Sequence, residues 1–451
     1  MRRVAVFGLG IAGQATARAI AGRSIGVRLA DDHITDQIAT FADDIDAPLY
    51  DATEQGNIVK LLRDVDTLVP APGVPPHHPV IVAAQRAKIS VRSEIDIAYE
   101  WEQQRVGGPR PILGVTGTDG KTTTTMLTAA LLRGGGVSAA EVGNTDVPFI
   151  AALEEPHDAF VVECSSFRLY YTTMFRCEAS AWLNIAPDHL DWHPNFEDYV
   201  AAKARLWAHA RNSDVSVIPS DNDLITAHAS TSITRPTTFG LSNADYSVQG
   251  NELVSPHGSL CDVSRMWRSM PHDITNSLAA CALVLETGLV KAETISASLA
   301  TFEPAHHRIE LIGEFEGSRW FDDSKATSPH ASLTAIRAFE KMVLIAGGRN
   351  KGLDLAQMAS EPSRMVAVVA IGDDAPLIEK AFAGVCTVTR ASSMAEAVTT
   401  AASLASPGVD VVLSPGCTSY DWYRNYNERG DDFQRKVREH FGATNGGEVK
   451  P

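Results

Sequence analysis

The stretch ILGVTGTDGKTTTT, residues 112–125, joins a short apolar run to a glycine-rich turn, a lysine and four threonines. The apolar residues at 112–115 favour a buried strand, and the residues from Lys121 onward favour a helix. A strand, a glycine-rich loop and a helix in this order cradle phosphate groups, because backbone N–H groups and the positive end of the helix point at the anion. The stretch therefore predicts a phosphate-binding α/β domain around it.

Two residues of this loop have expected roles. Lys121 would reach the β- and γ-phosphates of a nucleotide, and the hydroxyl of Thr122 would hold Mg²⁺. The strict pattern of such loops has glycine where this chain has Val115, so an ordinary glycine-rich turn with a surface lysine is the alternative. The lysine and the threonines after it favour the phosphate loop.

A carboxylate at the end of a later strand suits the same site. The apolar run 160–162 ends in Glu163. Ligands of open parallel sheets bind at the carboxyl ends of the strands, where a carboxylate can hold Mg²⁺ together with phosphate oxygens. Taken alone, Glu163 would be a solvated turn residue, and the phosphate loop favours the metal-binding interpretation.

A dense polar cluster follows the strand-like run 181–185. The sequence NIAPDHLDWH at 184–193 holds two aspartates, two histidines and a tryptophan within its last six residues. This density at a strand end indicates metal or substrate contact. Lys203 follows in a helical run at 196–210, where a lysine taken alone would lie at the surface with its charge in water.

The N-terminal region carries a second glycine-rich turn. Gly8, Gly10 and Gly13 lie between a strand-like run and a helix-like run, and Asp31 follows the next strand. This spacing is typical of dinucleotide-binding turns, and the same turn can hold any diphosphate. No later part of the sequence has the pattern of a hydride-transfer site.

Composition limits the class of protein. The 451 residues are 44% apolar and 21% charged, which is enough for buried cores and, at about 150 residues per domain, for three domains. The net charge of −16 has the wrong sign for a protein that wraps nucleic acid or an anionic membrane, and no run approaches the ~18 apolar residues of a membrane span. Six cysteines without a C-x-x-C pair favour free thiols, so we expect a cytoplasmic protein.

The order of predicted elements indicates the domain organisation. Strand-like and helix-like runs alternate along the chain, which predicts α/β domains with largely parallel sheets. Two seams interrupt this order, a polar stretch rich in glycine and proline at 103–111 and a second break at 302–308. We therefore expect domains at residues 1–105, 106–304 and 305–451.

Together these motifs resemble the Mur ligase family, ATP-dependent amide-forming enzymes of peptidoglycan precursor synthesis, and the likeness covers nearly the whole chain. Within the family, the C-terminal motifs resemble those of members that add D-glutamate. The motifs are TGTDGKTTT at 116–124, ECSSF at 163–167, NIAPDHLDWH at 184–193 with Lys203, His307-Arg308, DDSKAT at 322–327, Gly347-Gly348 with Lys351, SPGCTSYD at 414–421, Asn425-Tyr426 and Arg429-Gly430.

The resemblance implies a fold and an activity. The fold would have three α/β domains: an N-terminal Rossmann-like domain, a central P-loop ATPase-like parallel sheet and a C-terminal Rossmann-like domain. The activity would be ATP-dependent addition of D-glutamate to UDP-N-acetylmuramoyl-L-alanine through an acyl phosphate, in the cytoplasmic pathway that supports cell-wall formation, cell shape and division. The resemblance also implies two Mg²⁺ ions, a carbamylated Lys203 and a monomer that binds no nucleic acid.

The resemblance assigns roles to single residues in four groups. Catalysis would involve Lys121, Glu163, His189 and Lys203, and metal binding Thr122, Glu163, His189 and Lys203. ATP would contact Gly117, Thr118, Asp119, Gly120, Lys121, Thr122, Thr123, Asn276, Arg308 and Asp323. The UDP substrate would contact Gly8, Gly10, Asp31, Pro72, Gly73, Asn144 and Ser165, and D-glutamate would contact Thr327, Lys351, Ser419 and Tyr426.

Some positions depart from the usual motifs, and other functions remain open. Ala71, Asp119, Arg168 and Asp273 stand where serine, asparagine, glutamine and asparagine are usual in the family. Another amino-acid ligase of the family is the nearest alternative. An NAD-dependent oxidoreductase would explain the turn at Gly8 but leaves Lys121 without a role, and a non-catalytic nucleotide switch leaves the C-terminal motifs unexplained.

Overall fold

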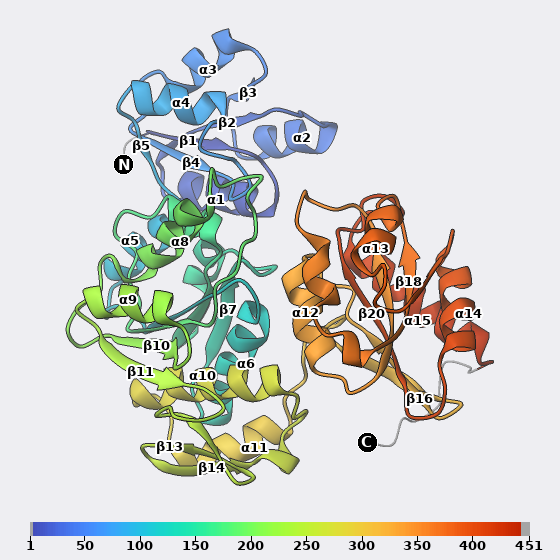
Figure 1. The fold of residues 1–451 in the computed structure, drawn as a ribbon. Coiled ribbons are helices and arrows are strands. Elements are labelled where there is room, and N and C mark those ends of the chain that lie inside the picture. Colours follow the sequence, from blue (N-terminus) through green and yellow to red (C-terminus); the bar gives the residue numbers. More distant parts are fainter. Residues whose placement is uncertain (1–2, 443–451) are drawn as a thin grey trace. The chain divides into compact units, whose positions relative to one another are not determined.

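The computed structural model describes residues 3–442, which form two compact units. Residues 3–269 and 273–302 make up the first unit, and residues 270–272 and 303–442 the second. Helices and mainly parallel sheets alternate along both units (Figure 1). The predicted α/β class is therefore confirmed. The three domain boundaries expected from the sequence stay a prediction, because the two parallel sheets of the first unit share apolar clusters.

The first sheet lies in the N-terminal part of the first unit. Its strand order is β3-β2-β1-β4-β5, and every neighbouring pair is parallel. The chain reverses its direction of winding between β1 and β4, so the loops after these two strands border the crevice where such sheets bind ligands. The elements are β1 (Arg3–Phe7), α1 (Ile11–Gly22), β2 (Gly26–Asp31), α2 (Asp36–Asp44), β3 (Leu49–Asp51), α3 (Gln55–Leu62), β4 (Thr67–Pro70), α4 (Pro79–Arg86), β5 (Ser90–Val91) and α5 (Glu94–Gln103).

The second sheet is also parallel and has β6 in its interior. Its order is β11-β10-β9-β6-β8-β7, so the chain leaves β6 toward one edge and later returns to its other side. The elements are β6 (Ile112–Thr116), α6 (Lys121–Gly134), β7 (Ala139–Gly143), η1 (Phe149–Glu154), β8 (Ala159–Glu163), α7 (Ser166–Tyr170), β9 (Ala179–Trp182), α8 (Phe196–Ala204), η2 (Arg205–Trp207), β10 (Val215–Pro219), α9 (Asp223–Thr231), β11 (Arg235–Phe239), η3 (Val263–Arg265), α10 (Pro271–Glu286), η4 (Ala292–Thr294) and α11 (Ile295–Ala300).

The first unit differs from the sequence expectation in three places. A small antiparallel sheet, β12 (Ser247–Gln249), β13 (Glu252–Ser255) and β14 (Gly258–Asp262), was not predicted. The strand expected at 181–185 ends at Trp182, because the residues after it turn toward the glycine-rich loop. The helical run expected at 196–210 is α8 followed by the short 3-10 turn η2.

The second unit contains one six-stranded sheet with the order β15-β16-β20-β17-β18-β19. Only the edge pair β15 and β16 is antiparallel, and the other pairs are parallel. The elements are β15 (Glu310–Phe315), β16 (Ser318–Asp322), α12 (Pro329–Arg337), β17 (Met342–Gly347), η5 (Leu355–Ala359), η6 (Pro362–Arg364), β18 (Met365–Ile371), α13 (Ala375–Ala381), β19 (Thr387–Arg390), α14 (Met394–Leu404), β20 (Asp410–Gly416) and α15 (Tyr426–His440).

The two sheets of the first unit share a buried core. Val4 and Val6 of β1 belong to the same apolar cluster as Phe160 and Val162 of β8. The residue between the latter two, Val161, packs in a different cluster, as expected when successive side chains of a strand point to opposite faces of the sheet. Helix α5 connects the sheets and packs against η1.

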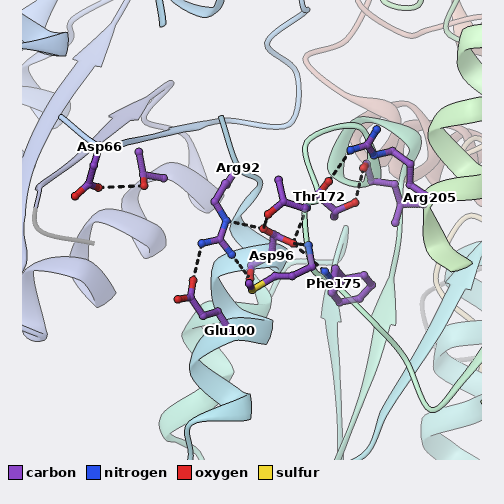
Figure 2. A network of polar contacts seen from close by, with 11 residues as sticks. Asp66, Arg92, Asp96, Glu100, Thr172, Phe175 and Arg205 are labelled. Atoms are coloured by element: carbon purple, nitrogen blue, oxygen red, sulfur yellow. Dashed lines mark hydrogen bonds and ion pairs between the residues drawn. The ribbon is translucent and has the colours of Figure 1, made fainter. Parts of the chain in front are cut away.

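Helix α5 also carries a buried polar network (Figure 2). The Asp96 carboxylate is fully buried and accepts a hydrogen bond from Nε of Arg92 at 2.6 Å. It also accepts three backbone N–H bonds from residues 173–175 at 2.8 to 2.9 Å. Arg92 pairs with Glu100 as well, at 2.5 Å. One carboxylate thus ties the end of the first sheet to the segment that leads into β9.

A second buried ion pair explains one departure from the family motifs. Arg168 stands on α7, and its Nη1 lies 2.5 Å from Oε2 of Glu94. The other Glu94 oxygen accepts the backbone N–H of Ile150 at 2.6 Å. Burial raises the pKa of Glu94, while Arg168 acts in the opposite direction. Arg168 therefore has an ionic partner within its own unit.

We expect Asp96→Ala to lower the free energy of unfolding of the first unit by roughly 3 to 5 kcal/mol, because the buried Arg92 and three backbone donors lose their acceptor. Urea unfolding followed by tryptophan fluorescence measures the change. The matched control is Glu154→Ala, which removes the exposed pair with Arg23 and should change the free energy by about 1 kcal/mol or less. An Asp96→Ala protein as stable as the control would contradict this role.

Candidate active site

The predicted phosphate loop connects β6 to α6. Gly120 has a φ of +81°, and a Cβ at this position would lie 2.6 Å from Oδ1 of Asn276 on α10. Glycine is therefore needed both for the backbone conformation and for the close approach of Asn276. Nζ of Lys121, the first residue of α6, donates to the carbonyl of Thr118 at 2.7 Å. The structure thus brings together Asn276, Gly120 and Lys121, three of the residues that the resemblance assigned to ATP.

Asn184 braces the loop from the neighbouring strand end. Its Oδ1 accepts the backbone N–H groups of Thr118 at 3.0 Å and Asp119 at 2.9 Å, and its Nδ2 donates to the Asp119 carbonyl at 3.1 Å. Asn184 was part of the polar cluster 184–193 but was not among the predicted contact residues. Its position after a strand adjacent to β6 was the available signal.

Lys203 lies inside the site, so its interpretation as a surface lysine is wrong. The side chain is 1% exposed, and Nζ donates to the Gly117 carbonyl at 2.7 Å. Nζ also lies 4.5 Å from the centre of the Tyr199 ring. Burial, and next the charge of Lys121, hold the pKa of Lys203 well below its usual value. The neutral amine form of Lys203 is therefore populated at a lower pH here than in water.

Glu163 ends β8 beside the loop, since it pairs in register with Val115 of β6. Its Oε1 accepts a hydrogen bond from Nδ2 of Asn144 at 3.1 Å. Oε2 is buried and has no hydrogen-bond partner within residues 3–442. A buried carboxylate oxygen in this state suits a bound cation.

The two histidines of the polar cluster have different surroundings. His189 is partly exposed, has a φ of +55° and places Nε2 3.3 Å from Oδ2 of Asp188. His193 is buried, with Nδ1 2.7 Å from Oδ2 of Asp198 and Nε2 3.0 Å from the Ser166 hydroxyl. Burial lowers the pKa of His193. His193 therefore joins α7 to α8, whereas the partly exposed His189 lies beside Asp188.

The predicted UDP-substrate residues lie at strand ends of the two sheets of the first unit. Oδ2 of Asp31 accepts the backbone N–H of Leu9 at 2.6 Å, which holds the turn between Gly8 and Gly10 against the end of β2. The carbonyl of Gly73, next to Pro72, accepts Nε1 of Trp192 at 3.2 Å and so contacts the polar cluster 184–193. Ser165 caps α7, because its hydroxyl accepts the Arg168 N–H.

The remaining predicted residues belong to the second unit. Arg308 precedes β15, whose first residue pairs with the last residue of β16, and Asp323 and Thr327 follow β16. An Asp323 oxygen accepts the Ser414 hydroxyl at 2.7 Å. The other three, Lys351, Ser419 and Tyr426, come after β17, after β20 and at the start of α15. Ser419 is 2% exposed. All six thus lie around the carboxyl ends of β16, β17 and β20.

The arrangement in the first unit can bind a polyphosphate with a divalent cation. The loop supplies backbone N–H groups and the fixed charge of Lys121, and Glu163 offers an unpartnered carboxylate oxygen. Thr122, the second residue of α6, is in position to offer a hydroxyl on the same turn. These parts define an α/β protein with a candidate phosphate-binding loop beside a candidate cation site.

Two family models match the chain: the Mur ligase middle domain over residues 115–284 and the Mur ligase, glutamate ligase domain over residues 307–417. A UDP-N-acetylmuramoylalanine–D-glutamate ligase of Frankia casuarinae is 38% identical over 450 residues, 96% of this chain and 93% of the relative. The enzyme of the same name from Streptomyces coelicolor is 34% identical over 463 residues, 97% of this chain and 98% of the relative. The chain belongs to the Mur ligase family.

Solved structures share the fold. A UDP-N-acetylmuramate–alanine ligase of Thermotoga maritima superimposes with a TM-score of 0.60 at 17% identity and covers 97% of this chain and 99% of its own. A MurF ligase of the same organism, determined in complex with ADP, gives a TM-score of 0.59 at 16% identity over 85% of this chain and 92% of its own. The predicted three-domain α/β fold is thus that of known family members.

Two further expectations agree with the structure. All six cysteines are free thiols. Within residues 3–442, no helix combines the length and apolar character that crossing a membrane requires.

We expect Asn184→Ala to raise the KM for ATP by roughly tenfold, because two backbone N–H groups of the phosphate loop lose their common acceptor. Asn184→Asp keeps the acceptor but loses the Nδ2 donor and adds a negative charge beside the phosphates, so it should be at least as impaired. Steady-state kinetics with varied ATP measure both effects. Asn222→Ala, which removes the cap of α9, is the control for loss of an asparagine that accepts a backbone N–H. An unchanged KM for ATP in Asn184→Ala would refute the bracing role.

Proposed function

We propose that this chain is an ADP-forming ligase that joins D-glutamate to UDP-N-acetylmuramoyl-L-alanine in peptidoglycan precursor synthesis. The observation that supports this most strongly is the near full-length similarity to enzymes of that name, combined with a phosphate loop next to an unpartnered carboxylate. The reaction supports cell-wall formation, cell shape and division. The enzyme would act as a cytoplasmic monomer with domains at residues 1–105, 106–304 and 305–451.

Nucleotide and metal would be bound mainly by the central region. ATP would contact residues 117–123, Asn276, Arg308 and Asp323. Thr122 and Glu163 would hold one Mg²⁺, and His189 with a carbamylated Lys203 would hold a second. The buried position of Lys203 and the unpartnered oxygen of Glu163 support these roles. Bound Mg²⁺ would neutralise charge that builds on the phosphoryl oxygens.

The UDP substrate would bind at the carboxyl ends of strands in the two sheets of the first unit, and D-glutamate at the carboxyl ends of strands in the sheet of the second unit. The UDP substrate would contact Gly8, Gly10, Asp31, Pro72, Gly73, Asn144 and Ser165, which surround the switch point of the first sheet or the end of β8. D-Glutamate would contact Thr327, Lys351, Ser419 and Tyr426. Hydroxyl groups and a lysine suit the two carboxylates of this amino acid.

The reaction needs an activated carboxylate, because a free carboxylate has no adequate leaving group. An oxygen of the alanyl carboxylate attacks the γ-phosphorus of ATP, the bond to the bridging oxygen breaks, and ADP leaves. The neutral amine of D-glutamate then attacks the carbonyl carbon of the acyl phosphate, inorganic phosphate leaves, and the amine releases a proton. Lys121 and Arg308 would stabilise the transferring phosphoryl group.

The environment of Lys203 supports the proposed carbamylation. The lone pair of the neutral amine attacks the carbon of CO₂, a nitrogen–carbon bond forms and one proton goes to water, which leaves an anionic carbamate. Its oxygens are hard ligands of the kind that Mg²⁺ prefers, whereas an ammonium group would repel the ion. Burial beside Lys121 supports this, because it favours the neutral amine.

Phosphate release from ATP should require both UDP-N-acetylmuramoyl-L-alanine and an amino acid, and D-glutamate should be the preferred acceptor. We expect kcat/KM for D-glutamate to exceed that for L-glutamate, D-aspartate or a diamino acid by roughly tenfold or more. Coupled phosphate detection measures all four acceptors. Preference for one of the other three would exclude D-glutamate as the substrate and leave the amide-ligase activity, whereas nicotinamide-dependent turnover would point to an oxidoreductase.

Lys203→Ala should lower kcat by roughly 10- to 100-fold or more, because a ligand of the second Mg²⁺ is lost. A short carboxylic acid at high concentration should restore part of the activity by supplying an anionic oxygen. The control is Lys291→Ala, which alters an exposed lysine of the same unit. Nuclear magnetic resonance with ¹³C-labelled CO₂ should give a carbamate signal in the wild type that is absent from Lys203→Ala. Full activity of the alanine variant would contradict the proposal.

A further inference from the structure

Arg429, on the first turns of α15, has an unusual position in the second unit. Its side chain is 1% exposed. Nε donates to the Ser324 hydroxyl at 3.0 Å, Nη2 to the Ser324 carbonyl at 2.7 Å and Nη1 to the Cys417 carbonyl at 3.1 Å. A Cβ at Gly348 would lie 3.2 Å from Nη1. The guanidinium group thus lies against three separate loops.

These loops follow three adjacent strands. Ser324 comes after β16, Cys417 after β20 and Gly348 after β17, and the sheet order places β20 between the other two. The same loops carry the residues proposed to bind the acceptor amino acid: Thr327, Ser419 and Lys351 lie two to three residues further along. The Ser324 hydroxyl also donates to the carbonyl of Tyr426 at 2.7 Å.

Contacts on the same helix hold Arg429 in this place. A Cβ at Gly430 would lie 2.2 Å from Nδ1 of His307, so only glycine allows this approach. One turn later, Nε2 of Gln434 donates to Oδ2 of Asp322 at 3.0 Å, and the same oxygen lies 2.7 Å from His307 Nδ1. Helix α15 is therefore fixed against the end of β16 by contacts that directly follow the arginine.

None of the three hydrogen-bond acceptors of the Arg429 guanidinium group carries a charge. Two acceptors are carbonyl oxygens and one is a hydroxyl. Burial lowers the pKa of Arg429 to about 10, so the group stays protonated at neutral pH. Replacing it with an apolar residue would leave buried carbonyls without donors. A lysine has a single nitrogen and cannot reach the loops in the same fork geometry.

We propose that Arg429 is a positioning residue of the acceptor site, which sets the loops after β16, β17 and β20 in the geometry that binds the amino acid. This inference rests on the proposed function. It assigns to Arg429 no contact with substrate. A displacement of about 1 Å in such a site can cost about 10²-fold in rate, so the loss of one clamp on three loops should be measurable.

The test compares Arg429→Lys with the control Arg435→Lys, an exposed arginine two turns further along α15. We expect Arg429→Lys to raise the KM for D-glutamate by roughly 10- to 100-fold, with the KM for the UDP substrate within about twofold of wild type. Hydrogen–deuterium exchange should be faster in residues 323–328, 348–352 and 417–420 and unchanged in β15 and α14. A purely structural role would instead change all KM values alike or only the thermal stability, and that result would overturn the proposal.

A second variant keeps the test decisive if Arg429→Lys does not fold. Ser324→Ala removes one acceptor of Arg429 and the donor to Tyr426, so the KM for D-glutamate should rise in the same direction but less. An unchanged KM for D-glutamate in a folded Ser324→Ala protein would overturn the proposed positioning role of Arg429. If the wild type prefers another amino acid, the proposed substrate fails, and the KM of that acceptor decides the role of Arg429. If the wild type uses no amino acid as acceptor, the hydrogen–deuterium exchange rates of the three loops decide whether Arg429 holds them in place.

Discussion

The site in the first unit depends on two lysine amines held over the carbonyls of one glycine-rich loop. Nζ of Lys121 lies 2.7 Å from the Thr118 carbonyl, and Nζ of Lys203 lies 2.7 Å from the Gly117 carbonyl. The charge of Lys121 disfavours a charge on Lys203, which is nearly without contact with water. Two charged amines at these positions would be costly. The cost falls when an anion enters the site or when one amine loses its proton. The proposed phosphate binding and carbamate formation would both lower this cost.

The parts of this site that follow from local chemistry could be predicted from the sequence. Gly120 and Lys121 are adjacent, and the strand, loop and helix around them follow one another directly in the sequence. Glu163 ends an apolar run that is typical of a strand. The burial of Lys203 could not be predicted, because a helical period does not tell which neighbour covers a given face. The same holds for Asn184, whose role depends on β9 lying next to β6, a pairing between segments about 65 residues apart.

In each of the two units, one polar side chain holds loops of the proposed site in place, but the type of side chain differs. In the first, the amide of Asn184 both accepts and donates, which suits a loop that presents N–H groups and a carbonyl to it. In the second, the loops present carbonyl and hydroxyl oxygens, and a guanidinium group with several donors fits them. In both cases the brace comes from outside the loops that it holds. Sequence patterns within a loop therefore reveal the residues that meet a ligand more readily than those that hold the loop.

The position of Arg168 shows how a departure from a family motif can be accommodated. A buried arginine in place of a neutral amide adds a charge that must be compensated within the protein. Glu94, at the start of α5, meets Arg168 at 2.5 Å and at the same time accepts the backbone N–H of Ile150. The pair joins the connecting helix to α7 directly beside Ser165, a proposed substrate contact. The added charge is thus neutralised by a residue that also fixes the junction of the two sheets, so the substitution at 168 and the acidic residue at 94 have to be considered together when this chain is compared with relatives that carry glutamine.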